Sequence, residues 1–134
     1  MGAKVLIVED EFLIALQLED IVTSAGHSVV GIVCDKASLG GIDDAPQVAL
    51  VDLNLRDGPS GSSIAMELAR SHGTRILYVT ANPNQIAQPA PTAVGVVSKP
   101  FSSNAILTAI AIAMGQEAAG SGRRADIDLF PVPN

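Results

Sequence analysis

The stretch Val48-Ala49-Leu50-Val51-Asp52-Leu53-Asn54-Leu55 decides the fold of this chain. Four apolar residues run directly into a carboxylate, and a loop rich in Gly, Pro and Ser follows. An uninterrupted apolar run of this length is typical of a strand buried on both faces, as in parallel sheets. An Asp directly after such a strand lies where open α/β sheets place their ligand sites. For this run alone, the alternative that Asp52 caps the following turn is equally good.

Length, composition and charge narrow the class of protein. The chain has 134 residues, which suits one domain, and 48% of them are apolar, which allows a core without disulfides or a structural metal. Cys34 is the one cysteine, so we expect a reducing, cytoplasmic environment. The net charge of −6 argues against a nucleic-acid partner. The sequence has neither a membrane-spanning run of about 18 apolar residues nor a signal-peptide pattern, so we expect no membrane partner.

Four other apolar runs resemble this strand, and patterns with a helical period lie between them. The expected strands are residues 4–8, 29–33, 48–51, 75–80 and 93–98. The expected helices are residues 12–25, residues 61–71, and a last one that Ser102 or Ser103 caps and that ends near Met114. Between strands four and five, residues 82–92 contain three prolines, which leave little room for a regular helix.

This alternation predicts an α/β fold, a doubly wound five-stranded parallel sheet, over residues 1–114. Residues 115–134 are rich in Gly, Ser and charged residues and predict a flexible C-terminal tail. Within this tail, Ile127-Asp128-Leu129-Phe130 could dock on a sheet edge or on a partner, but disorder is the simpler interpretation.

Polar side chains follow four of the five expected strands: Glu9-Asp10, Asp52, Thr80 and Lys99. Because the carboxyl ends of parallel strands meet at one edge of a sheet, we expect these side chains to converge. Three carboxylates at close range repel one another, and Lys99 offsets only one of their charges. Oxygen ligands in a strongly charged pocket suit Mg²⁺. A carboxylate placed there can attack a phosphoryl group and form an acyl phosphate.

With these motifs in place, the chain resembles the receiver domains of two-component response regulators. The matching residues are the acidic pair Glu9-Asp10, Asp52 in VALVDLNL, Thr80 in YVTAN, and Lys99-Pro100-Phe101 in SKPF, and the match covers residues 3–114. The resemblance implies a flavodoxin-like sheet with strand order 2-1-3-4-5. It also implies a protein that is no enzyme in the usual sense but assists its own phosphorylation and dephosphorylation.

The resemblance assigns a role to each matching residue. Asp52 is the phosphoacceptor, served by a histidine kinase or a histidine phosphotransfer protein. Mg²⁺ is bound by Asp10 and Asp52 directly, by Glu9 through water, and by the main-chain carbonyl of Asn54. Thr80 is the switch hydroxyl, and Lys99 pairs with the phosphoryl group. A cis peptide bond is expected between Lys99 and Pro100.

The chain departs from the receiver pattern at three places. Val96 stands at the switch position where most receivers carry an aromatic residue. The segment of residues 82–92 is interrupted by proline where receivers have a helix, and Arg56 replaces a proline after the phosphoacceptor. These departures resemble an atypical group of bacterial single-domain receivers. We therefore expect phosphorylation to act by ordering residues 82–92.

The last helix is unusually apolar, with almost no charge between Ser102 and Met114. One interpretation is a homodimer or partner face made by strand five and this helix. The other is that small alanines are tolerated at the surface.

Three functions remain to be compared. The first is a stand-alone receiver that signals through protein contacts with a downstream target, or that serves as a phosphate sink. The second is a pseudo-receiver that binds partners without phosphorylation, which the intact acidic, Thr and Lys positions disfavour. The third is a small phosphatase or other metal hydrolase. Asn54 counts against a haloacid-dehalogenase-type phosphatase, which needs an Asp at that position.

Overall fold

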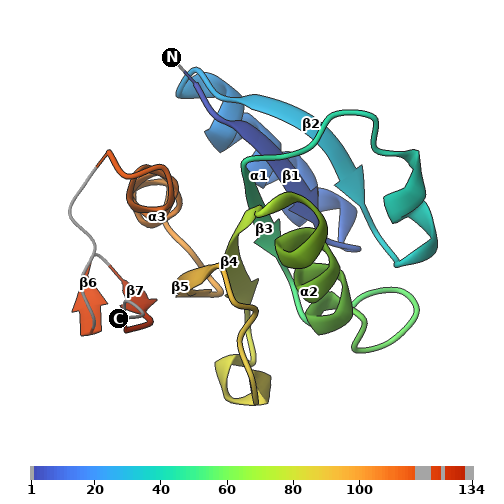
Figure 1. The fold of residues 1–134 in the computed structure, drawn as a ribbon. Coiled ribbons are helices and arrows are strands. Elements are labelled where there is room, and N and C mark those ends of the chain that lie inside the picture. The colour runs from blue at the N-terminus through green and yellow to red at the C-terminus, as the bar shows by residue number, and fades with distance from the viewer. Residues whose placement is uncertain (1, 117–121, 125, 132–134) are drawn as a thin grey trace.

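The computed structural model of the chain describes residues 2–116, 122–124 and 126–131. A sheet forms the middle layer, and helices cover both of its faces (Figure 1). The strands are β1 (Lys4–Val8), β2 (Ser28–Val33), β3 (Val48–Val51), β4 (Arg75–Thr80), β5 (Ala93–Ser98), β6 (Gly122–Arg124) and β7 (Ile127–Leu129). The α-helices are α1 (Phe12–Ser24), α2 (Gly61–His72) and α3 (Ser103–Ala113), and two short 3-10 helices are η1 (Ala37–Gly41) and η2 (Pro83–Gln85).

The first five strands form the predicted parallel sheet in the order β2-β1-β3-β4-β5. All four residues of β3 are buried, as expected for a central strand with helices on both sides. The prolines between β4 and β5 leave only the three-residue η2 there, so the absence of a full helix in this segment is confirmed.

Each face of the sheet has its own apolar core. On one face, Leu18 of α1 packs in the same cluster as Ile106 and Ile110 of α3. On the other, Ile64 and Leu68 of α2 pack against alternate residues of the central strands. Because the central strands are buried on both faces, their sequences show no alternation of apolar and polar residues. None of the helices in the described part of the chain is long and apolar enough to cross a bilayer.

Local signals in the sequence explain where two helices end or begin. Gly73 has a φ of 65° and ends α2 in the left-handed conformation that glycine adopts without strain. The Ser102 hydroxyl accepts a hydrogen bond of 3.0 Å from the Ala105 N–H, so Ser102 and not Ser103 is the N-cap of α3.

The C-terminal segment differs from the prediction. Strand β7 pairs antiparallel with β5, and β6 pairs with β7, so the sheet has seven strands and not five. A flexible tail is therefore the wrong description of residues 122–124 and 126–131. The physical reason is that Ile127 and Leu129 alternate with polar residues and bury their side chains in the core beside α3. The remaining tail residues, 117–121, 125 and 132–134, lie outside the described part of the chain, and so does the prediction for them.

The same pairing changes the interpretation of the apolar last helix. Strand β5 is bonded to β4 on one side and to β7 on the other. Six residues of α3 are buried within the chain, among them Ile112 and Ala113. The expected dimer face at strand five and the last helix is thus closed by the chain itself, and the apolar character of α3 needs no second copy to explain it.

Candidate functional site

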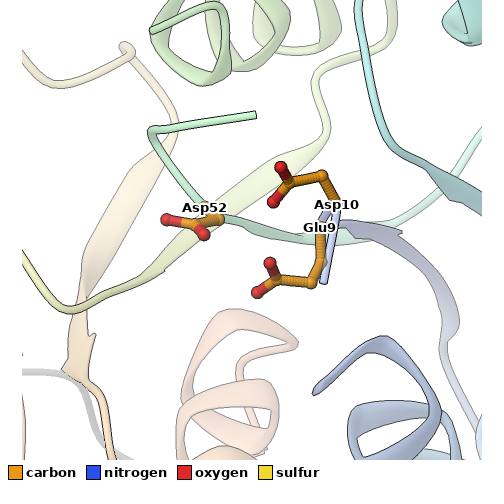
Figure 2. Close-up of side chains that lie close together, drawn as sticks. All are labelled: Glu9, Asp10 and Asp52. Atoms are coloured by element: carbon orange, nitrogen blue, oxygen red, sulfur yellow. The ribbon is translucent and has the colours of Figure 1, made fainter. Parts of the chain in front are cut away.

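Three carboxylates meet at the carboxyl edge of the sheet. Val8 of β1 and Val51 of β3 are paired in register, so the residues that follow these strands are level with each other. Figure 2 shows the side chains of Glu9, Asp10 and Asp52 gathered there. One oxygen of each carboxylate lies within 4.8 Å of the others, an arrangement that could hold a metal ion. The predicted convergence of the acidic residues is confirmed.

Lys99 ties two of these carboxylates together from the end of β5. Its ammonium lies 2.6 Å from Glu9 Oε1 and 3.0 Å from Asp52 Oδ2. The peptide bond between Lys99 and Pro100 is cis, as the resemblance implied. Lys99 follows β5, and strand β4 lies between β5 and β3. Its ammonium therefore reaches past the end of β4 to bridge the side chains that follow β1 and β3.

Burial and charge oppose each other in this pocket. Burial raises the pKa of Glu9, and the hydrogen bond from Lys99 offsets only part of that effect. Burial alone would lower the pKa of Lys99, but its hydrogen bonds to Glu9 and Asp52 outweigh burial and raise the pKa above its ordinary value. Lys99 is thus held in its charged form by the acidic residues. Three acidic groups lie together, and one ammonium bonds to two of them. A bound cation would add positive charge and so reduce the remaining repulsion among the carboxylates.

Asp52 is buried but not sealed. Its side chain keeps 10% of its surface exposed, whereas the Glu9 side chain keeps 1%. The loop after Asp52 is held close by Gly61, at the start of α2, whose N–H donates to the Leu53 carbonyl over 3.1 Å. A Cβ at Gly61 would collide with the Asp52 carbonyl oxygen, so glycine is required for this close approach.

Thr80 lies at the same edge of the sheet, at the end of β4. It is fully buried, and its hydroxyl accepts a hydrogen bond of 3.0 Å from the Asn82 N–H. Its carbonyl accepts another of 3.0 Å from the Lys99 N–H, so Thr80 and Lys99 are on adjoining, bonded backbones. The structure thus places Thr80 beside Lys99 and bonds its hydroxyl to the start of the segment that follows β4.

Two other predicted site residues have partners that the sequence did not reveal. The Asn54 side chain donates to Gln85 Oε1 over 3.0 Å and so links the loop after Asp52 to η2. A metal-binding role of the Asn54 main-chain carbonyl stays a prediction. Val96 is buried and pairs with Tyr78 on one side and with Asp128 on the other.

An aromatic pair lies next to the position where the usual aromatic residue is missing. The rings of Tyr78 and Phe130 meet edge to face, with centroids 6.3 Å apart and an interplanar angle of 68°. The Tyr78 hydroxyl accepts a hydrogen bond of 2.9 Å from the buried Ala90 N–H. Of the interpretations that the sequence left open for Ile127-Asp128-Leu129-Phe130, docking on a sheet edge is confirmed, and disorder, the simpler one, is wrong. The alternation around Ile127 and Leu129 was the available signal.

Comparison with known proteins agrees with this geometry. A model of the family described as "Response regulator receiver domain" matches residues 5–111. The chain belongs to the response regulator receiver family. The match covers all five parallel strands and most of α3, and it includes the three acidic positions, Thr80 and Lys99.

Several relatives of this receiver domain carry the name PhyR. The Phyllosphere-induced regulator PhyR of Methylorubrum extorquens is 30% identical over 105 residues, which are 75% of this chain and 39% of that protein. The receiver domain of Erythrobacter litoralis PhyR superposes with a TM-score of 0.76 at 31% identity and covers 91% of this chain and 97% of that one. The response regulator PhyR of Brucella abortus gives a TM-score of 0.75 at 30% identity, over 87% of this chain and 49% of that one. This receiver domain therefore spans about half or less of the longer relatives.

Proposed function

We propose that this receiver domain accepts a phosphoryl group on Asp52 from a histidine kinase or a histidine phosphotransfer protein, with Mg²⁺ bound, and that it signals through protein–protein contacts in the cytoplasm. The observation that carries the proposal is the single pocket in which three carboxylates lie within 4.8 Å of one another and Lys99 bonds to two of them. Such a pocket positions a nucleophile and neutralises charge, which is what phosphoryl transfer requires.

The donor set fits Mg²⁺ and not a softer metal, because it consists of carboxylates and contains neither Cys nor His. Glu9, Asp10 and Asp52 would hold the ion, with the Asn54 carbonyl as a further ligand. When bound, the ion would supply positive charge against the repulsion among the acidic groups and against the phosphoryl oxygens.

The residues of the chain would do the remaining work. An oxygen of Asp52 attacks the phosphorus and forms an acyl phosphate, while the donor histidine leaves with its electron pair. The Lys99 ammonium, already 3.0 Å from Asp52, would pair with an oxygen of the transferred group. The Thr80 hydroxyl accepts from the Asn82 N–H and would donate its own proton to another phosphoryl oxygen. The Thr80 side chain would then tie the start of the segment 82–92 to the phosphoryl group, in keeping with the expected ordering of this segment.

A docking surface for the phosphodonor protein lies directly beside the pocket. The first turns of α1 follow the acidic pair and expose Phe12 (72%), Leu13 (78%) and Leu16 (40%). Large apolar side chains exposed together mark a surface that another protein covers. A helix of a kinase or phosphotransfer protein bound there would bring its histidine to Asp52.

The relatives bear on the output. Bartonella quintana PhyR, 30% identical over 87% of this chain, is called an anti-anti-sigma factor. That name describes a protein that acts by binding another protein. For this chain, we infer only that it passes on its signal by contacting another protein.

The proposal is tested by incubating the chain with acetyl phosphate and Mg²⁺ and measuring its intact mass. The parent chain is expected to gain one phosphoryl group, and neither the Asp52→Asn variant nor the parent with a chelator gains any. Lys99→Ala is expected to slow the addition of the phosphoryl group, which should still occur on Asp52. If the parent chain gains no mass, the pseudo-receiver alternative replaces this proposal. If the parent chain releases phosphate from simple esters catalytically, the hydrolase alternative replaces this proposal.

A further inference from the structure

The turn of residues 55–58, directly after Asn54, closes on itself. The Leu55 N–H donates to the Gly58 carbonyl over 2.8 Å, and the Gly58 N–H donates to the Leu55 carbonyl over 3.1 Å. Gly58 has a φ of 109°, a conformation that glycine adopts without strain. The Leu55 side chain is buried in the core beside α2, so the turn is fixed to the core at one residue.

The hydrogen bond of the Leu55 N–H also fixes the direction of the Asn54 carbonyl. These two groups belong to the same peptide unit, which is trans. A trans peptide unit is planar, and its N–H and C=O point in opposite directions. The orientation of the turn 55–58 therefore decides where the Asn54 carbonyl points, and this carbonyl is the main-chain Mg²⁺ ligand of the proposed function.

The segment that follows β2 holds this turn from the outside. The Arg56 N–H donates to the Cys34 carbonyl over 3.2 Å. The Lys36 N–H donates to Asp57 Oδ2, also over 3.2 Å. Both the backbone of the turn and the Asp57 side chain are thus bonded to the segment after β2.

Asp57 and Lys36 also contact the start of α2. The Asp57 carboxylate accepts a hydrogen bond from the Ser60 hydroxyl, and the Lys36 ammonium donates to the Ser63 hydroxyl. Ser60 directly precedes α2, and Ser63 lies in its first turn. The Asp57 carboxylate therefore joins three parts of the chain: its own turn, the segment after β2 and the residue before α2.

We propose that Asp57 is a positioning residue for Mg²⁺, which holds the turn 55–58 in the orientation that offers the Asn54 carbonyl to the ion. Asp57 itself does not touch the ion. Without its carboxylate, the Arg56 N–H alone bonds the turn to the segment after β2. The Asn54 carbonyl must then be ordered when the ion binds, and this cost weakens binding. The inference rests on the proposed function, because it takes the Asn54 carbonyl as a Mg²⁺ ligand.

The test is a titration of the full, unphosphorylated chain with Mg²⁺ alone, followed by amide NMR. Asp57→Ala is expected to weaken Mg²⁺ binding about tenfold, as when a residue that orients a metal ligand is removed. Before Mg²⁺ is added, the Leu55 amide should exchange with solvent faster in this variant than in the parent. Asp57→Asn keeps one side-chain oxygen as an acceptor, so it should recover part of the affinity although it carries no charge. Asp57 is exposed, so both variants should fold.

Asp35→Ala separates positioning from charge. The charges of Asp35 and Asp57 interact, but the Asp35 carboxylate accepts its hydrogen bonds from Ser38. Removing it takes away the same charge and should change the Mg²⁺ affinity by about twofold or less. At saturating Mg²⁺, Asp57→Ala should react with acetyl phosphate as fast as the parent, because the substitution affects the affinity for the ion and not the reacting groups.

The inference is overturned if Asp57→Ala binds Mg²⁺ as tightly as the parent, or if Asp35→Ala weakens binding to the same extent. A parent chain that binds no Mg²⁺ would overturn both this inference and the magnesium part of the proposed function. A parent chain that binds Mg²⁺ about tenfold more tightly than Asp57→Ala, but gains no phosphoryl group, would support this inference and contradict the proposed phosphorylation.

Discussion

Lys99 is the residue on which the charge balance of the pocket depends. It is the cation that bonds to both Glu9 and Asp52, and its side chain is only 12% exposed. Truncating it would leave a buried Glu9 without its ionic partner, a loss that is costly in a buried pair. Both phosphoryl chemistry and part of the local stability therefore depend on the same ammonium.

The raised pKa of Lys99 predicts a loss of stability at alkaline pH. In the unfolded chain the group titrates near its ordinary value of 10.5, and in the folded chain above it. Its contribution is thus fully present below pH 10.5 and is lost as the pH rises through the folded value. Urea unfolding across this range should show the parent chain losing more stability than Lys99→Met, which has no such group. A parallel decline of the two chains would contradict the prediction.

At the scale of elements, two of the contacts made by the segment between β4 and β5 connect it to other parts of the site. Gln85 of η2 bonds to Asn54, two residues after Asp52. Ala90 bonds to the Tyr78 hydroxyl, and Tyr78 in turn contacts Phe130. The segment therefore joins the loop after Asp52 to the aromatic pair that lies beside Val96, the position where most receivers carry an aromatic residue.

Tyr78→Phe tests the hydrogen bond between the Ala90 N–H and the Tyr78 hydroxyl. The substitution removes the acceptor of a buried backbone N–H at Ala90, which should lower the free energy of unfolding by about 1–3 kcal/mol. Denaturant unfolding measures the loss, and faster exchange of the Ala90 amide should accompany it. If the variant is as stable as the parent and the Ala90 amide stays protected, the hydrogen bond does not hold the segment.

The contact of Gln85 with Asn54 should transmit the expected effect of phosphorylation to the segment. We expect the amides of residues 82–92 to exchange more slowly when beryllium fluoride, a phosphoryl mimic, and Mg²⁺ are bound. Gln85→Ala, which removes the contact with Asn54, should reduce this difference. Identical exchange with and without the mimic would show that the segment does not report on the pocket.

These elements also show what the sequence can and cannot predict. The run Val48–Val51 and its four counterparts predicted the parallel sheet, because a fully buried strand is visible as an unbroken apolar stretch. The pocket followed, because strand ends in a parallel sheet converge at one edge. Docking of the β7 residues on a sheet edge was the second choice after disorder, because three residues carry too short a pattern and the stability of β7 comes from a partner strand distant in the sequence. The contact of Asn54 with Gln85 likewise depends on loop geometry that no local pattern encodes.

At the scale of the whole molecule, α1 supplies a second surface beside the pocket. The large apolar residues that α1 exposes, Phe12, Leu13 and Leu16, belong to neither of the two cores. The α1 surface serves phosphoryl transfer in our proposal.

Leu13→Asp separates docking from chemistry. Leu13 is 78% exposed, so the variant should keep the stability of the parent within about 0.5 kcal/mol. Its phosphorylation by the cognate kinase or phosphotransfer protein should fall about tenfold, as expected for the loss of one apolar contact, while its reaction with acetyl phosphate stays unchanged. Ser24→Asp adds the same charge at the far end of α1 and should affect neither reaction. An equal loss with both phosphodonors would place Leu13 in the chemistry and not in docking.

We propose that one carboxylate in this pocket, that of Asp52, takes the phosphoryl group. The most direct measurement is borohydride reduction after reaction with acetyl phosphate and Mg²⁺, which converts a phosphorylated aspartate into homoserine, followed by peptide mass analysis. Homoserine is expected at position 52 alone, and none is expected when a chelator is present. Homoserine at Asp10, or none at any position under conditions in which the chain is folded, would contradict it.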